Sequence, residues 1–464
     1  MNHKRRDCIK LIAGSTTGIV LSGLGTNIFA TEKGNRVNPL DYMESQNKMH
    51  AIEKILAIHA GKEFVQKGEI INCKIDLAEV NDLYLQVIES FEEVGGKRVM
   101  CPDKVAFVFD HYAPAPTIKS AANHKVMRDF VRAQKIKYLF DINSGVCHQV
   151  MPEAGLVYPG MTLVATDSHT TTHGAFGAFA TGVGATDLAA ILLTGELWFK
   201  VPEIIKITIN GTTPKGVFPK DVILHILGKL KQDAAIYKGI EFTGTFIDQL
   251  SIPGRMTLCN MTVEMGAKTA YIQPDSITEE YLRKYTTNSY TVFHTDTGYH
   301  YEKEYSFDIN NLQPTVAAPD SVDNSATINE VEGIKVDQIF IGTCTNGRTE
   351  DLAVVAGILK GKKISGDCRL VIIPASDKVY MESLEAGYIE ILVKAGATIT
   401  APGCGPCLGT HQGLLAEGEV GITTGSRNFP GRMGDRKAKI YITSPAVAAA
   451  TALTGNLTNP ANYL

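Results

Sequence analysis

Apolar residues recur at helical spacing near the start of the regular part of the chain, in MHAIEKILAIHAG (residues 49–61), where Gly61 is a suitable helix stop. Further along, short apolar runs end in polar or ionisable residues, at 104–111 (KVAFVFDH), 137–142 (KYLFDI) and 161–169 (MTLVATDSH). Helical patterns such as that of residues 117–135 lie between these runs. Strands that alternate with helices predict parallel sheets covered on both faces.

A similar alternation resumes in the last third of the chain, with apolar runs at 336–346, 369–376, 397–404 and 421–429. Between the two blocks lie strand-like ITING (207–211) and helix-like KDVILHILGKL (220–230). A length of 464 residues suits two to four domains. We therefore expect an α/β protein with three α/β/α lobes, at residues 49–202, 203–322 and 323–464.

The first 48 residues follow a different pattern. Arg5 and Arg6 precede a weakly apolar stretch interrupted by Gly, Ser and Thr, and Ala30 offers a cleavage point. We expect residues 1–30 to be a twin-arginine-type export signal and residues 31–48 a polar linker. The alternative is a cytoplasmic protein with a disordered N-terminal extension. The apolar run is too short and too interrupted for a permanent membrane anchor.

Composition limits the classes of partner. The chain has 45 basic and 49 acidic residues and a net charge of −4. This balance gives no indication of a basic surface for a nucleic-acid partner. Its nine cysteines are odd in number and irregular in spacing, which argues against a disulfide framework. A few working thiols among buried ones are the better expectation.

Cys404 and Cys407 form a C-x-x-C on a loop rich in glycine and proline, and Cys344 follows an apolar run. The C-x-x-C alone suits a redox pair, half a zinc site or part of an iron–sulfur site. Three thiolates can hold three irons of a cubane cluster and leave the fourth iron open as a Lewis acid. Spacing alone leaves the iron–sulfur site, a zinc loop and buried core cysteines open.

Three histidines stand next to or near carboxylates at the ends of predicted strands. His111 follows Asp110, His148 follows the GVC segment, and His169 stands two residues after Asp167. A single histidine is more often structural. Ligands of parallel α/β folds gather at the carboxyl ends of the strands, so three histidines there favour acid–base chemistry.

The segments IGTCTNGRTEDL, APGCGPCLG, SRNFPGR, VFDHYAPAPTIK and GMTLVATDSHTTTHGAFGAFATGVGATD resemble signature segments of the aconitase family. The resemblance covers residues 49–455 and is greatest to large subunits of the 3-isopropylmalate dehydratase and homoaconitase type. It implies an aconitase-like fold, with parallel-rich sheets around a central cluster site, and a hydro-lyase acting on a 2-hydroxy di- or tricarboxylic acid. Dehydration of 3-isopropylmalate in leucine biosynthesis is the first choice. Homoaconitate, methylmalate or citraconate, and dimethylmalate are the alternatives within the class.

The resemblance also implies residue roles. Cys344, Cys404 and Cys407 would bind a [4Fe–4S] cluster. The catalytic set would comprise three pairs, Asp110 with His111, Asp167 with His148, and Glu264 with His169, and His111 would protonate the leaving hydroxyl. The substrate-binding residues would be Asn81, Asp82, Ser168, Asn260, Ser426, Arg427 and Arg432.

Two departures from the family pattern shape the expectations. Asn81 precedes Asp82 where the family has histidine or glutamine, so altered substrate recognition, reduced activity or a non-catalytic cluster-sensing role stays open. The sequence also lacks the swivel domain that carries the serine base in single-chain aconitases. We therefore expect a heteromer in which a separate small subunit supplies that domain. A zinc-binding scaffold remains the rival for the same thiols.

Overall fold

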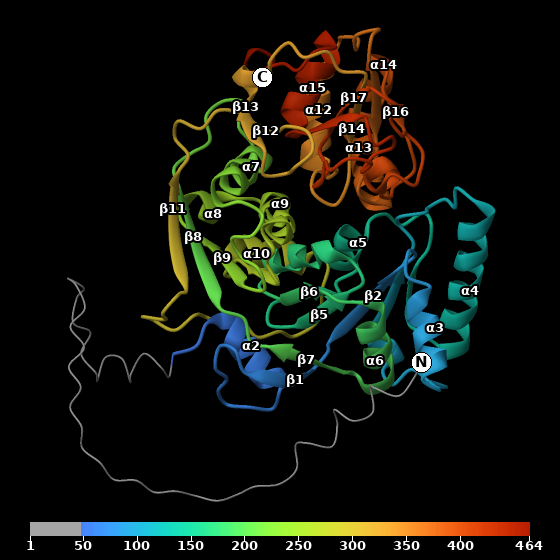
Figure 1. Cartoon of the computed structure of the whole chain (residues 1–464), viewed down its shortest axis with the longest axis vertical. Coiled ribbons are helices and arrows are strands. Elements are labelled where there is room, and N and C mark those ends of the chain that lie inside the picture. Colours follow the sequence, from blue (N-terminus) through green and yellow to red (C-terminus); the bar gives the residue numbers. More distant parts are fainter. Residues whose placement is uncertain (1–47) are drawn as a thin grey trace, which may run out of the picture. The chain divides into compact units, whose positions relative to one another are not determined.

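The computed structural model describes residues 48–464, in which one short ribbon and three larger sheets are built (Figure 1). The expected export signal, and the expected linker except for Lys48, lie outside the described residues. Among residues 48–464, no helix combines the length and the apolarity that crossing a bilayer requires. Every cysteine in this part of the chain is a free thiol.

The first large sheet has five parallel strands in the order β4-β3-β2-β5-β6. The apolar runs at 104–111, 137–142 and 161–169 form β3, β4 and β5, as predicted. All four residues of β3 are buried, which is typical of a strand covered on both faces. The strands are β2 (Leu77–Asn81), β3 (Val105–Val108), β4 (Tyr138–Phe140), β5 (Thr162–Ala165) and β6 (Phe179–Gly182).

Helices cover both faces of this sheet. On one face, Val80 and Phe107 pack with residues of α3 (Gln86–Glu93), α4 (Ile118–Gln134) and α6 (Ala185–Thr194). On the other face lie α5 (Cys147–Glu153) and the long 3-10 helix η3 (Ser168–Phe176). The helix predicted at 117–135 is confirmed as α4, where the Thr117 hydroxyl accepts a hydrogen bond of 3.1 Å from the amide of Ser120. The remaining short helix is η2 (Pro102–Lys104).

A two-stranded antiparallel ribbon joins β1 (Ile70–Lys74) to β7 (Glu196–Lys200). The helix expected at 49–61 is confirmed as α2 (Ala51–His59), which packs against the ribbon.

The second large sheet has four parallel strands in the order β10-β9-β8-β11. The first four residues of ITING (207–210) form the end of β8, and the predicted helix at 220–230 is α7. One hydrophobic core is continuous from the first sheet into this one, since Leu163 and Ile207 belong to the same cluster. The elements are β8 (Ile204–Asn210), α7 (Pro219–Leu230), β9 (Gly239–Thr243), α8 (Thr245–Gln249), α9 (Ile252–Asn260), η4 (Met261–Met265), β10 (Thr269–Tyr271), α10 (Ser276–Arg283) and β11 (Lys303–Asp308).

The third large sheet has seven strands in the order β13-β12-β18-β17-β14-β15-β16. Ile339 and Ile341 of β14 face helices α12 to α15, whereas Phe340 between them faces Leu415 and Met433, so successive residues point to opposite faces. The strands are β12 (Thr315–Ala317), β13 (Ser325–Thr327), β14 (Gln338–Ile341), β15 (Arg369–Ile372), β16 (Thr398–Ile399), β17 (Val420–Thr423) and β18 (Lys439–Ile442). The helices are α11 (Ile328–Val331), α12 (Thr349–Leu359), α13 (Asp377–Glu385), α14 (Tyr388–Ala395), η5 (Gly405–Leu408), α15 (Pro445–Thr454) and η6 (Pro460–Asn462).

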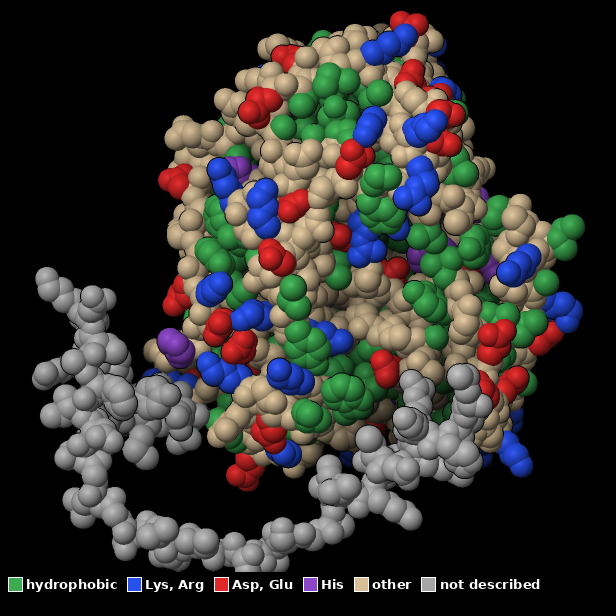
Figure 2. All heavy atoms as spheres, in the orientation of Figure 1, with side chains coloured by type: hydrophobic (Ala, Val, Ile, Leu, Met, Phe, Trp, Pro, Cys, Tyr) green, Lys and Arg blue, Asp and Glu red, His purple; other side chains and the backbone are tan. Residues whose placement is uncertain are grey.

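The expected division into three lobes stays a prediction. Each large sheet takes its strands from one stretch of the chain, but β12 precedes the expected boundary at 322 and already belongs to the third sheet. On the face shown in Figure 2, acidic and basic side chains are interspersed, as the nearly balanced charge of the chain leads one to expect.

Candidate active site

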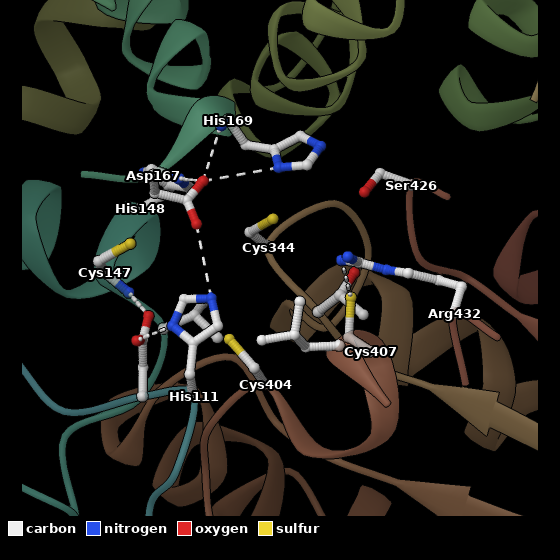
Figure 3. Close-up of a pocket in the computed structure, with 14 residues that line it drawn as sticks. His111, Cys147, His148, Asp167, His169, Cys344, Cys404, Cys407, Ser426 and Arg432 are labelled. Atoms are coloured by element: carbon white, nitrogen blue, oxygen red, sulfur yellow. Dashed lines mark hydrogen bonds and ion pairs between the residues drawn. The ribbon is translucent and has the colours of Figure 1, made fainter. Parts of the chain in front are cut away.

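A cavity lies where the loops that follow β3, β5, β14, β16 and β17 meet (Figure 3). These loops leave the carboxyl ends of parallel strands, where ligands of α/β folds are bound. Many of the residues predicted from the sequence line it: Asp110, His111, His148, Asp167, His169, Cys344, Cys404, Cys407, Ser426 and Arg432.

The three predicted ligand cysteines point into this one cavity (Figure 3). The Cys344 sulfur accepts a hydrogen bond of 3.2 Å from Nδ2 of Asn260. The Cys407 sulfur lies 3.6 Å from Nη2 of Arg432, which donates to it. Cys344 and Cys407 therefore each have a polar neighbour suited to a thiolate.

The spacing of the thiols distinguishes a cluster from a single metal ion. In the part of the chain that the structure describes, Asp110, His111 and Cys404 are the only three or more His, Cys, Asp or Glu side chains whose ligand atoms all lie within 4.8 Å of one another. The three sulfurs together are therefore spread more widely than ligands of one zinc ion, whose Zn–S bonds are about 2.3 Å. A cluster of several irons bridges a wider gap, so the donor set fits an iron–sulfur cluster.

Burial raises the pKa of the Cys344 thiol to about 12, and it raises the pKa of Cys404 well above the ordinary value. These thiols are therefore neutral at physiological pH until a cation draws off their protons. Cys147 also lines the cavity, but its amide donates to Asp110 and burial raises its pKa. Cys147 therefore supports the site through its backbone, and its thiol stays neutral.

The first carboxylate–histidine pair is close. Nδ1 of His111 lies 2.6 Å from Oδ1 of Asp110, and its Nε2 lies 3.5 Å from Oδ2 of Asp167. Burial by itself lowers the pKa of His111, but the charge that Cys404 carries once it is deprotonated, together with the charge on Asp110, raises that pKa well above the ordinary value. The ring is therefore held as a proton donor between two carboxylates.

The second pair extends into a longer chain of hydrogen bonds. Nε2 of His148 lies 3.0 Å from Oδ1 of Asp167, and its Nδ1 lies 3.3 Å from Nε2 of His173. Burial and the charge on His148 hold the pKa of His173 well below its ordinary value, so this ring is neutral. His173 can then fix the tautomer of His148. The sequence reasoning missed His173, although it stands in the same HTTTHG segment as His169.

The third pair joins the predicted acid–base set to a predicted substrate arginine. Nε2 of His169 and Nε of Arg427 lie 2.9 and 2.7 Å from Oε1 of Glu264, and Nη2 of Arg427 donates to the Ser168 hydroxyl at 3.1 Å. Burial opposes ionisation of Glu264, but His169 and Arg427 lower its pKa. The structure thus brings together every carboxylate–histidine pair that the resemblance implied. Their catalytic roles stay predictions.

Asn81 and Asp82 lie elsewhere. Both are fully buried, and neither lines the cavity. The Asp82 carboxylate accepts from the amides of His111 (3.0 Å) and Tyr112 (2.8 Å) and lies 3.0 Å from Nε2 of His124. It therefore holds the loop that carries His111, and its partners are within the protein. A direct contact of these two residues with substrate stays a prediction that this geometry does not favour.

Comparisons with known proteins agree with the site. The family model described as Aconitase family (aconitate hydratase) matches residues 53–332 and 328–455. The 3-isopropylmalate dehydratase large subunit 1 of Methanopyrus kandleri is 48% identical over 413 residues, which are 89% of this chain and 99% of that protein. The probable methanogen homoaconitase large subunit of Methanothermobacter thermautotrophicus is 46% identical over 418 residues, 89% of this chain and 98% of that protein.

A crystal structure of Thermococcus kodakaraensis aconitase X aligns with a TM-score of 0.45 and 14% identity over 87% of this chain and 97% of that one. The sequence matches span most of the chain at close to half identity. The chain therefore belongs to the aconitase family, and this membership implies an iron–sulfur cluster.

Proposed function

We propose that this chain is the cluster-bearing large subunit of a [4Fe–4S] hydro-lyase that dehydrates and isomerises 3-isopropylmalate. The observation that carries the proposal is the meeting in one cavity of three cysteines, a histidine held between two carboxylates, and an arginine. The 48% identity to a 3-isopropylmalate dehydratase large subunit over 99% of its length supports this substrate.

Cys344, Cys404 and Cys407 would hold the cluster. When bound, the cluster would supply a Lewis acid for the substrate hydroxyl. The protein contributes the proton for the leaving group from His111, whose ring is oriented by Asp110 and Asp167.

Arginine side chains would bind the substrate carboxylates. Arg432 lines the cavity, and its buried Nε has no hydrogen-bond partner among the described residues. An unsatisfied buried donor costs free energy, which a carboxylate would recover. Arg427 is already oriented by Glu264 and lies beside Ser168, so the pair offers a second polar contact for the substrate.

The proton-abstracting base is proposed to come from a partner. The curated relatives carry the name large subunit, which implies a small subunit for them. We assign to such a small subunit the swivel domain and its base, so that the working enzyme is a heteromer. Part of the substrate selectivity would then reside in the partner.

Homoaconitase is the second candidate, supported by the 46% identity to a probable homoaconitase large subunit. Both reactions need the same cluster, the same proton donor and carboxylate-binding arginines. The two substrates differ at the substituent away from the reacting carbons, so kcat/KM separates the candidates.

The test is turnover by the anaerobically purified chain, with and without its small subunit, on 3-isopropylmalate, homoaconitate, methylmalate and dimethylmalate. We expect turnover only with the small subunit present, and the highest kcat/KM with 3-isopropylmalate. Preference for homoaconitate would select the second candidate. An intact cluster with no turnover of any of these acids would overturn the enzyme proposal and favour a non-catalytic cluster-sensing protein.

A further inference from the structure

A fully buried lysine holds the segment after β17. Lys220 stands in the first turn of α7, and its side chain is inaccessible to solvent. Its Nζ donates to the carbonyl oxygens of Thr424 at 2.8 Å and Gly425 at 2.7 Å. These two residues directly precede Ser426 and Arg427, which are predicted to bind substrate. The amine of Lys220, on α7, therefore fixes the backbone of the segment that follows β17.

No carboxylate lies within 4.0 Å of this amine in residues 48–464. A buried ammonium without a counter-charge is costly, because its hydration is lost without compensation. The two carbonyls compensate in part. Negative charge nearby would compensate the rest of the lost hydration. The loops that carry the predicted cluster ligands are the part of the protein where such charge would lie.

The amine is linked to both ligand loops by short contacts. The Thr424 carbonyl that accepts from Lys220 also accepts at 2.8 Å from the Thr345 hydroxyl, and Thr345 follows Cys344. A Cβ built on Gly425 would lie 3.8 Å from the Cys407 sulfur, so the backbone that Lys220 binds packs against that ligand. Lys220 thus binds a stretch of backbone that contacts Thr345, the neighbour of Cys344, and also packs against Cys407.

Charge balance agrees with this arrangement. Burial lowers the pKa of Lys220 to about 7, and negative charge acts in the opposite direction, on Cys344 and Cys407 once they are deprotonated and on Asp351. Deprotonated ligand cysteines therefore favour the charged form of the lysine, and the charged lysine in turn favours an anionic group in the cavity.

We propose that Lys220 is a positioning residue of the cluster site, with two separable effects. Its two hydrogen bonds hold the segment 424–428 in place, and its positive charge favours the more negative, reduced state of the cluster. The second effect rests on the proposed [4Fe–4S] function, whereas the first holds in the protein without a cluster.

Three variants separate the two effects. Lys220→Gln keeps N–H donors and removes the charge, Lys220→Met removes both, and Thr345→Val keeps the charge and removes the other donor to the Thr424 carbonyl. Lys229→Gln is the matched control, because it removes the same charge from an exposed position of the same helix. Circular dichroism establishes that each variant is folded.

The first measurement is the reduction potential of the cluster by redox titration followed by electron paramagnetic resonance. Lys220→Gln and Lys220→Met should shift the potential to more negative values, with about a tenfold lower reduced-to-oxidised ratio at a fixed potential, since one nearby charge is worth that order of energy. Thr345→Val and Lys229→Gln should leave the potential unchanged. An unaltered potential in Lys220→Gln would overturn the electrostatic effect.

The second measurement is amide hydrogen exchange of residues 424–428 in the apoprotein. Lys220→Met and Thr345→Val should exchange about tenfold faster, the order expected from the loss of a net hydrogen bond or two. Lys220→Gln should exchange more slowly than Lys220→Met. Equal protection in the wild type, Lys220→Met and Thr345→Val would overturn the positioning effect. If Lys220→Met does not fold, Lys220→Gln and Thr345→Val still decide both effects. A wild-type chain that never binds iron would sink the proposed function and leave the exchange result standing.

Discussion

The backbone amide of Cys404 donates a hydrogen bond of 2.8 Å to the backbone carbonyl of Asp110. Cys404 belongs to the C-x-x-C loop that follows β16 of the third sheet, and Asp110 lies in the loop that follows β3 of the first sheet. The carboxylate of the same Asp110 binds the ring of His111 and the amide of Cys147. A predicted metal ligand and a predicted proton donor are therefore held in register by one residue, which is how rigid sites keep reacting groups aligned.

Replacing Cys344, Cys404 or Cys407 by serine should each remove most of the bound iron and the brown colour, because three thiolates are the whole protein ligand set in the proposal. Iron and sulfide analysis with the absorption spectrum measures this. Cys368→Ser is the control, since Cys368 is buried outside the cavity. Full iron content in all three ligand variants, or zinc in place of iron, would contradict the assignment.

His111→Asn should lower kcat by about 10²–10⁴ with a small change in KM, because the loss of a general acid acts on the chemical step. Steady-state kinetics of the complete heteromer measures this. His225→Asn, at a half-buried position of α7 outside the cavity, should be close to wild type. A change confined to KM would assign His111 to substrate binding instead.

Arg427→Lys should raise KM about tenfold or more and spare the cluster. The guanidinium binds Glu264 and Ser168 at the same time, and an ammonium cannot reproduce that fork. Arg369→Lys, on the exposed pair with Glu419, is the matched control. An unchanged KM for all substrates would exclude Arg427 from the binding site.

His59 and Asp76 form an ion pair away from the cavity, with Nε2 2.6 Å from Oδ2. Burial lowers the pKa of His59, but the hydrogen bond and charge of Asp76 raise it overall; burial likewise raises the pKa of Asp76, and His59 lowers it overall. The histidine contribution to stability is complete below its unfolded pKa of about 6.5 and is lost as pH rises through the higher folded value. The aspartate contribution is present above about pH 3.9 and is lost as pH falls through the lower folded value.

His59→Asn should therefore lower the free energy of unfolding most between about pH 4 and 6.5, by about 1 kcal/mol for a partly buried pair. Urea unfolding of the apoprotein at pH 5.5 and pH 9 measures the difference, which should shrink at the higher pH. A difference that is the same at both values would show that the ion pair contributes nothing to stability.

We propose export of the folded protein by the N-terminal signal, after the cluster is inserted in the cytoplasm. The mature periplasmic protein should then begin near Thr31, since Ala30 offers the cleavage point. N-terminal sequencing of the protein from separated cell fractions measures this. An intact Met1 in a cytoplasmic protein would support the alternative localisation.

The local elements could be predicted from the sequence because their physical signals are local. The apolar runs that became β3, β5 and β14 end in polar residues, and α4 and α7 show helical spacing. The order of strands in the third sheet has no such signal. There β12 pairs antiparallel with β18, although the two are far apart in sequence, and only the packed structure shows it.

The candidate site divides in the same way. Cys404 lies close to Cys407 in sequence, and Asp110 is next to His111. The proximity within each of these two pairs was therefore predictable from the sequence. Glu264 stands 95 residues from His169, and their pairing was expected only from the family resemblance. The sequence analysis missed His173 and Lys220. Both are polar residues of helical segments, and a sequence alone does not show that such a side chain is buried.

The cavity draws its thiols from two loops of the third sheet, its proton donor from the first sheet and its Asn260 contact from α9. Iron can be retained only after these distant stretches of polypeptide have docked, since half-formed sites lack the full set of donors. The absorbance of the cluster would then report how many molecules have completed their tertiary structure. In a mixture of molecules at different stages of maturation, absorbance of the chromophore would count the finished ones.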